Sequence, residues 1–182
     1  ILTSSKRASL GDMLKALQRE SGEKISVNPI TIQRGTKEYE ILRENALAYK
    51  KQNGELPKVF LANMGPLKQH KVRADFTTGF LEPGGFQVVS SDGFDKVENA
   101  IQATISSEAN IVVMCSTDDT YPELVPEFTK SLKARQPEMT IVIAGYPKDY
   151  VDNFKDIGVD AFIHLKANNL ELLKIFHQKA RV

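Results

Sequence analysis

The chain has a single cysteine, Cys115, and no tryptophan among its 182 residues. One cysteine excludes an internal disulfide framework and a zinc site made of several cysteines, and it fits a reducing, cytoplasmic compartment. No apolar run approaches the roughly 18 residues of a membrane-spanning helix, and no stretch resembles a signal peptide. We therefore expect no membrane partner. The first residue is Ile1 rather than methionine, which indicates a piece processed or cut from something longer.

An excess of charge of one sign is also missing. The 24 lysines and arginines balance 23 aspartates and glutamates, and no dense basic run is present. This balance argues against a nucleic-acid partner. The length, with 41% hydrophobic and 26% charged residues, is typical of one soluble α/β domain with an appendage.

From Lys58 onward, short apolar runs alternate with amphipathic stretches, five times in succession. The runs are "KVFLAN", "FQVVSS", "NIVVMC", "TIVIAG" and "DAFIHL". They are rich in Val, Ile and Phe, as buried parallel strands are. The stretches between them place apolar residues at helical spacing, for example Val97, Ile101 and Ile105. The pattern predicts a five-stranded, parallel, doubly wound sheet of the flavodoxin-like type, in the strand order 2-1-3-4-5.

Residues 1–57 have a different pattern. Ser9, with Asp12 three residues later, resembles a capping box, and a second helix is expected between Thr36 and Gly54. The stretch 24–35 between these helices reads as extended. Because residues 1–57 lack a core of their own, we expect them to pack on the α/β domain or on a partner.

Ligands of doubly wound sheets bind beyond the carboxyl ends of the strands, near the topological switch point. That rule selects four loops, at residues 64–70, 115–121, 145–148 and 165–168. The first contains one glycine, so neither the dinucleotide turn G-x-G-x-x-G nor a Ser/Thr/Gly-rich flavin phosphate loop is expected there.

A response-regulator receiver is the next alternative. Asp118, Asp119 and Lys166 imitate two of its features. However, the first strand ends in Asn63 and Met64, which leaves no carboxylate pair to hold Mg²⁺. The receiver chemistry is therefore not expected.

Isolated reactive side chains have simpler interpretations. Cys115 has no identifiable base beside it, so we expect a buried structural thiol. His70, at a strand-to-helix junction, lies where a cofactor ligand could be, but a surface or helix-capping role is simpler. His164 is expected to be packed or half-exposed, and His177 has no visible partner.

Several long stretches resemble the cobalamin-binding domain of methylmalonyl-CoA mutases. They are "KVFLANMGPLKQHKVRADFTTGFLEPGGFQVV", "CSTDDTYPELVPEFTKSLKA", "TIVIAGYPKDY" and "IGVDAFIHLKANNLELL". Upstream, "VNPITIQRGTKEYEILRENA" resembles the segment that joins the substrate-binding TIM barrel to that domain. The resemblance implies that residues 1–57 are a helical linker or the end of a preceding barrel, and that residues 58–182 form a cobalamin-binding-like α/β domain.

The first loop departs from the family pattern. Catalytic mutase chains carry D-x-H-x-x-G there, and the histidine coordinates cobalt while the aspartate orients it. In this chain Leu67, Gln69 and Val72 occupy the three motif positions. His70 lies one residue too late, and one residue corresponds to about 100° of rotation on a helix. The resemblance therefore implies a degenerate ligand site.

The other loops depart as well. Cobalamin-binding domains have a Ser-x-Leu turn after the third strand and a Gly-Gly pair after the fourth. This chain has Asp118 and Asp119 in the former loop and Tyr146 in the latter, which would crowd the cofactor's nucleotide tail. If a corrinoid were bound, the candidate residues would be His70, Cys115, Ser116, Thr117, Ala144 and Gly145.

The patterns "GPLxxHxxRA", "CSxDxxY" and "AGxP" resemble the small, non-catalytic subunit of two-chain mutases. The resemblance implies no catalytic residue, no metal and no cofactor in this chain, with His70 and Arg73 making local structural contacts. The partner would be a catalytic large subunit that holds adenosylcobalamin and isomerises methylmalonyl-CoA and succinyl-CoA. The alternative is a divergent corrinoid-binding domain that holds cobalamin without a protein histidine ligand.

Overall fold

The computed structural model describes residues 9–17, 28–29, 32 and 34–182. The chain divides into two compact units, Ile1–Gln33 and Arg34–Val182. In the first unit, the helix α1 (Leu10–Leu17) begins with the predicted capping box. The Asp12 amide donates to the Ser9 hydroxyl over 3.2 Å, and the Ser9 amide donates to the Asp12 carboxylate over 3.0 Å. The stretch predicted as extended, 24–35, lies mostly outside the described residues.

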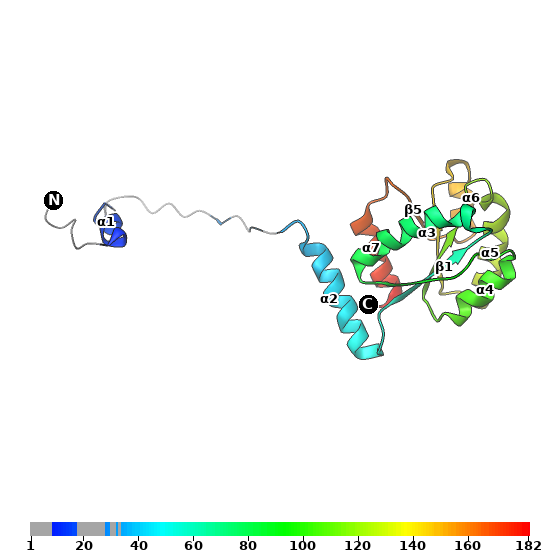
Figure 1. Ribbon diagram of the computed structural model, residues 1–182, viewed down its shortest axis with the longest axis horizontal. Coiled ribbons are helices and arrows are strands. Elements are labelled where there is room, and N and C mark those ends of the chain that lie inside the picture. The colour runs from blue at the N-terminus through cyan, green and yellow to red at the C-terminus, as the bar shows by residue number, and fades with distance from the viewer. Residues whose placement is uncertain (1–8, 18–27, 30–31, 33) are drawn as a thin grey trace. The chain divides into compact units, whose positions relative to one another are not determined.

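The second unit contains a five-stranded sheet (Figure 1). Its strands are β1 (Lys58–Asn63), β2 (Gln87–Ser90), β3 (Ile111–Cys115), β4 (Thr140–Ala144) and β5 (Ala161–Ile163). They lie in the order β2-β1-β3-β4-β5, and every neighbouring pair is parallel. The predicted fold class and strand order are confirmed.

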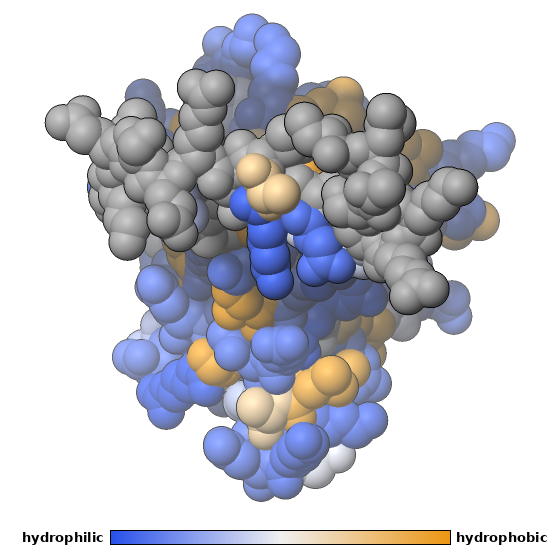
Figure 2. Space-filling model, turned by 90° about the vertical axis from the view of Figure 1, so that its left-hand side faces the viewer, coloured by the Kyte–Doolittle hydropathy of each residue, from blue (hydrophilic) through white to orange (hydrophobic). Residues whose placement is uncertain are grey.

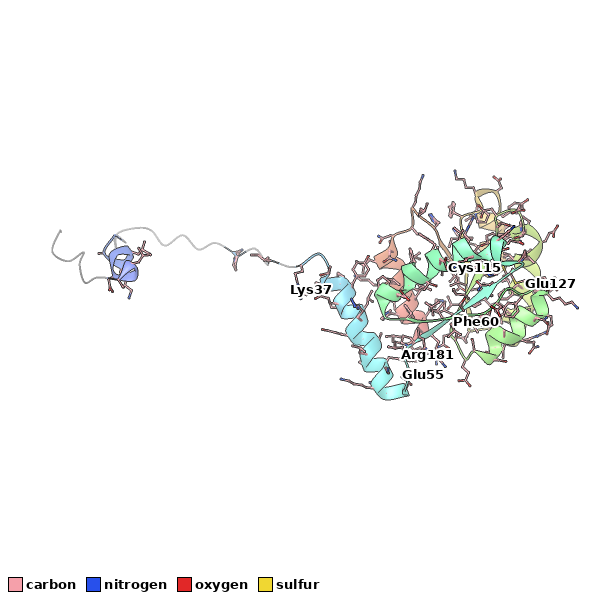
Figure 3. All side chains as sticks on the ribbon, viewed as in Figure 1. Lys37, Glu55, Phe60, Cys115, Glu127 and Arg181 are labelled. Atoms are coloured by element: carbon pink, nitrogen blue, oxygen red, sulfur yellow. The ribbon has the colours of Figure 1, made fainter. Side chains whose placement is uncertain are left out.

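Helices cover both faces of the sheet. They are α3 (Leu67–Leu81), α4 (Val97–Ser106), α5 (Tyr121–Arg135), α6 (Val151–Asp156) and α7 (Asn169–Ala180), with 3-10 turns η1 (Glu82–Gly84) and η2 (Lys148–Tyr150). Side chains alternate between the faces along each strand. Phe60 and Ala62 pack with α4, α5 and α6, whereas Val59 and Leu61 pack with α3 and α7. Phe60 and Cys115, labelled in Figure 3, mark the central strands.

The helix α2 (Lys37–Asn53) belongs to the α/β unit. It contacts α7 and η1, and it buries Leu42 and Ala46. A side chain at Gly85 would come within 2.7 Å of the Ala46 Cβ, so this close packing requires a glycine. The unit boundary thus falls after Gln33 rather than at the predicted position after residue 57. The apolar stripe of α2 is covered by this chain itself.

Two local predictions need correction. The helix α3 starts at Leu67, directly after Pro66, so Gln69 and His70 lie on its first turn rather than in a loop. His177, for which no partner was expected, is buried on α7. Its Nε2 lies 2.7 Å from the Gly84 carbonyl oxygen, and its ring packs edge-on against a phenylalanine.

The surface in Figure 2 is mainly hydrophilic outside the grey atoms, with smaller apolar areas between the polar side chains. Among the described residues, no helix combines the length and the apolar character that a membrane span requires.

Candidate functional site

The carboxyl ends of β1 and β3 lie side by side, because Asn63 pairs with Cys115 in the parallel register. From these two ends the chain leaves to opposite faces of the sheet, into α3 and α5. This is the topological switch point, where doubly wound folds bind their ligands. We call the space between the loops that follow β1, β3 and β4 the switch-point crevice.

Gln69 crosses this crevice from the first turn of α3. Its Nε2 donates to the Ser116 hydroxyl over 3.1 Å, which ties the loop after β1 to the loop after β3. The amide also lies over Gly65, where a Cβ would stand 2.3 Å from the Gln69 Oε1. Since Gly65 has φ 76°, this position favours glycine on backbone grounds too. Gln69, which the family resemblance places at the position of the cobalt-binding histidine, therefore acts here as a bridge between two loops.

Arg73, one turn further along α3, makes a second bridge. Its guanidinium donates to the carbonyl of Ala144 and, over 2.9 Å, to the carboxylate of Asp118. The guanidinium lies so close over Gly145 that a Cβ there would be 1.8 Å from Nη1. Arg73 therefore makes structural contacts, as expected, but they are not local: Ala144 is 71 residues away.

Tyr121, which the sequence analysis did not single out, forms hydrogen bonds with the backbone of the two residues to which the bridges attach. Its buried hydroxyl donates to the Ala144 carbonyl over 2.7 Å and accepts from the Ser116 amide over 3.0 Å. Burial raises the pKa of Tyr121 well above its usual range. The sequence feature that could have identified Tyr121 is its position, the sixth residue after Cys115 in "CSTDDTY".

The neighbouring thiol of Cys115 is fully buried. Burial raises the pKa of Cys115 to about 12, so the thiolate that nucleophilic chemistry requires is disfavoured. The expectation of a buried structural cysteine is confirmed.

His70 is directed away from the switch-point crevice. It is buried, its Nδ1 donates to the Gly65 carbonyl over 3.0 Å, and its ring edge lies against Gly93 in the loop after β2. A Cβ at Gly93 would be 2.7 Å from the His70 Cε1. The sequence analysis expected a surface or helix-capping role for His70, and the surface position is wrong because the side chain is buried.

The remaining candidates lie around the rim. Leu67 and Val72 are 64% and 77% exposed, so neither side chain closes the crevice. The Tyr146 ring packs at a tilt of 46° against the ring of half-exposed His164, with ring centres 4.7 Å apart. Thr117 uses its carbonyl to accept a hydrogen bond from Thr120. Asp119 and Tyr146 line a shallow pocket at the same rim.

An apolar cavity of about 680 Å³ lies between α3 and the loops after β4 and β5. Its wall includes Val72, Phe76 and Ile163, and its rim carries Lys148 and Lys166. Lys166 is thus in a ligand-sized cavity, but no aspartate belongs to the lining. The receiver-like arrangement of acidic residues and lysine is not assembled there.

The switch-point residues do not fit a histidine-ligated cobalamin. The Gln69 amide stands where the family resemblance expects the cobalt-binding histidine, and the Arg73 guanidinium occupies the space over Gly145. Nor do the described residues contain a group of three His, Cys, Asp or Glu side chains that could hold a metal ion.

Comparison with known proteins identifies relatives by sequence. The methylmalonyl-CoA mutase small subunit of Porphyromonas gingivalis W83 is 34% identical over 154 residues, which cover 85% of this chain and 24% of the relative. The chain is homologous to methylmalonyl-CoA mutase small subunits. The small subunit of Streptomyces virginiae is 31% identical over 124 residues, covering 68% of this chain and 20% of that protein. The chain thus spans between a fifth and a quarter of the length of these two small subunits. No protein-family model matches it.

Two solved structures have the same fold as this chain. A cobalamin-binding protein from Desulfitobacterium hafniense DCB-2 aligns with a TM-score of 0.53 and 24% identity, covering 78% of this chain and 67% of that one. A CheY-like protein from Pseudomonas aeruginosa PAO1 aligns with a TM-score of 0.52 and 18% identity, covering 68% and 93%. At these identities the likeness establishes the flavodoxin-like fold alone.

Proposed function

We propose that this chain is the cobalamin-fold part of a methylmalonyl-CoA mutase small subunit and that it performs no chemistry itself. Its task is to support a cytoplasmic heterodimer with a catalytic large subunit. The names of the relatives support a small-subunit role. Residues 34–57 belong to this domain as its packed helix, and what precedes them links it to the rest of the subunit.

One observation carries the proposal. The two bridges, Gln69 to Ser116 and Arg73 to Ala144, occupy the space in which a doubly wound fold takes its ligand. The first bridge joins α3 to the loop after β3, and the second joins α3 to the last residue of β4, so together they replace a bound cofactor as the contact between these segments. A domain closed in this way keeps its shape for assembly without a ligand.

In the proposed complex, the isomerisation of methylmalonyl-CoA and succinyl-CoA uses adenosylcobalamin held by the large subunit. The residues of this chain act on its own loops. Gln69 and Arg73 fix the loops after β3 and β4, and Tyr121 holds the backbone of both from inside. The loops are then presented in one fixed arrangement.

The second candidate is a divergent corrinoid-binding domain that uses no protein histidine ligand. The apolar cavity beside Gly145 is the observation that favours it, because its volume of about 680 Å³ lies in the range of small-molecule sites. The position of Arg73 over Gly145 weighs against this candidate.

Co-purification tests the heterodimer. The natural gene product that contains this chain is tagged and co-expressed with the large-subunit candidate encoded beside it, and the mass of the purified complex is measured by light scattering. We expect the sum of one small and one large chain. The large chain tagged alone, with an untagged unrelated domain, serves as the control. Recovery of the tagged protein by itself at its own mass would refute the heterodimer.

A further inference from the structure

A second cavity, of about 440 Å³, lies on the other side of α3 from the switch-point crevice, between the start of α3 and the loop after β2. We call it the α3–β2 cavity. Its lining includes Asn63, His70, Lys71, Asp75, Asp92 and Asp95. None of its residues takes part in the two bridges described above.

The walls of this cavity are fixed by hydrogen bonds. The Phe94 amide donates to the Asn63 carbonyl over 2.8 Å, and the Gly65 amide donates to the Phe94 carbonyl over 2.9 Å. The Asn63 side chain donates to the Ser90 hydroxyl and, over 2.7 Å, to the Ser91 carbonyl. The loop after β2 is thereby attached to the end of β1. A ligand would meet a preformed wall and would spend little free energy on ordering it.

Asn63 leaves one acceptor unused. The residue is 2% exposed, and its amide nitrogen donates to Ser90 at the end of β2 and to Ser91 in the loop after it. Its Oδ1 is buried and has no hydrogen-bond partner among the described residues. A buried acceptor without a donor costs about 1–3 kcal/mol. A donor supplied by a ligand in the cavity would remove that cost.

His70 supplies a further acceptor. Its Nδ1 contacts a carbonyl oxygen, which can only accept, so Nδ1 carries the proton. With one proton on the ring, at Nδ1, the Nε2 is an acceptor. Both deep polar side chains of the cavity, Asn63 and His70, therefore call for N–H or O–H donors.

The rim adds negative charge. Asp75, Asp92 and Asp95 belong to the lining together with a single cationic side chain, Lys71. Lys71 is already paired with Asp75 over 2.9 Å. Carboxylates at the mouth and unused acceptors inside favour a cation that carries several N–H donors.

We infer that the α3–β2 cavity binds a small alkylguanidinium cation. A guanidinium group is planar, always charged and presents five N–H donors, which suits a lining that holds the side chains of Asn63 and His70 and three aspartates. An ammonium ion would also satisfy the charge, but its compact donors reach fewer of these acceptors from one position. The inference concerns a site separate from the switch-point crevice and does not depend on the proposed heterodimer.

Nuclear magnetic resonance tests this assignment on the isolated full chain. Ethylguanidinium chloride is titrated into labelled protein at constant ionic strength, and the amide shifts of residues 91–95 and His70 are followed. We expect saturable shifts with a Kd of about 1–10 mM, as is typical of so small a ligand. Tetramethylammonium is the matched ligand control, because it has the same charge but no N–H donor, and it should give no saturable shift at these amides.

Matched variants locate the site. The double variant Asp92→Asn and Asp95→Asn removes rim charge, and we expect the Kd for ethylguanidinium to rise about fivefold. Asp119→Asn removes a charge from the lining of a different pocket, in the loop after β3, and should leave the Kd unchanged. Thermal unfolding of each variant verifies that it is folded. Equal responses to both cations, linear shifts without saturation, or equal weakening by Asp119→Asn would each overturn the assignment.

Discussion

The guanidinium of Arg73 donates to the carbonyl of Ala144 and pairs over 2.9 Å with the carboxylate of Asp118. The pair connects α3 to the loops after β3 and β4, across the place where a flavodoxin-like domain binds its ligand. Arg73 is 28% exposed and Asp118 is 54% exposed, so solvent screens the ion pair. Its main role is to hold the loops in position.

Loss of this bridge should weaken the fold modestly. We expect Arg73→Met to lower the free energy of unfolding by about 1 kcal/mol, because Ala144 keeps the hydrogen bond from Tyr121. Urea unfolding followed by circular dichroism measures the change. Lys71→Met, which removes an exposed pair on the same helix, is the control and should change stability by less than about 0.5 kcal/mol. Equal values for the two variants would show that the bridge adds nothing.

The variant Tyr121→Phe should lower the free energy of unfolding more than Arg73→Met does. The substitution leaves the Ser116 amide buried without an acceptor and removes a donor from Ala144, so we expect a loss of about 2 kcal/mol. Tyr150→Phe removes the same atom from a side chain that is 40% exposed, and about 0.5 kcal/mol or less is expected. Urea midpoints with unchanged slopes measure both effects. A Tyr121→Phe midpoint equal to that of the wild type would contradict the supporting role of this hydroxyl.

His177 should make stability depend on pH. Burial lowers the pKa of His177 below its ordinary value of 6.5, while the Gly84 carbonyl partly offsets the shift. The Nε2 donates to that carbonyl, so a second proton would go to Nδ1, which is buried without a partner among the described residues. In the unfolded chain the ring takes up its second proton as the pH falls through about 6.5. The folded state therefore loses stability as the pH falls below about 6.5.

The variant His177→Gln keeps a donor for Gly84 and removes the titration. We expect its free energy of unfolding to change less between pH 7 and pH 5 than that of the wild type. His164→Gln, at a half-exposed position, should keep the wild-type slope. The wild-type slope persisting in His177→Gln would assign the pH dependence to other groups.

The sequence predicts the sheet well, because each buried strand is a short run of Val, Ile and Phe between turn residues. It places the start of α3 four residues late, since Pro66 precedes a polar first turn that has no side-chain cap. The helix α2 carries only a narrow apolar stripe, so its contact with α7 and η1 could not be assigned to this chain rather than to a partner.

The candidate site, like the fold, could be predicted from the sequence only in part. Motif positions identify Gln69 as the substitute for a histidine, and its exposed neighbours Leu67 and Val72 as the other altered positions. The contacts that close the crevice span long sequence distances, 47 residues for Gln69 and 71 for Arg73. Contacts between residues so far apart in the sequence are determined by tertiary packing, and they leave no periodic signal in a single sequence. The buried partner of His177 was missed for the same reason.

The central claim is that the switch-point crevice is closed to cobalamin. It is tested most directly by mixing the chain with hydroxocobalamin, removing free cofactor by gel filtration and recording the absorption spectrum. A second sample carries Leu67→Asp, Gln69→His and Val72→Gly, which restore the ligand motif but leave Arg73, Asp118 and Tyr146 in place. We predict that neither protein retains the cofactor. Stoichiometric cobalamin on the wild-type chain, above all a base-off spectrum abolished by His70→Ala, would contradict the claim.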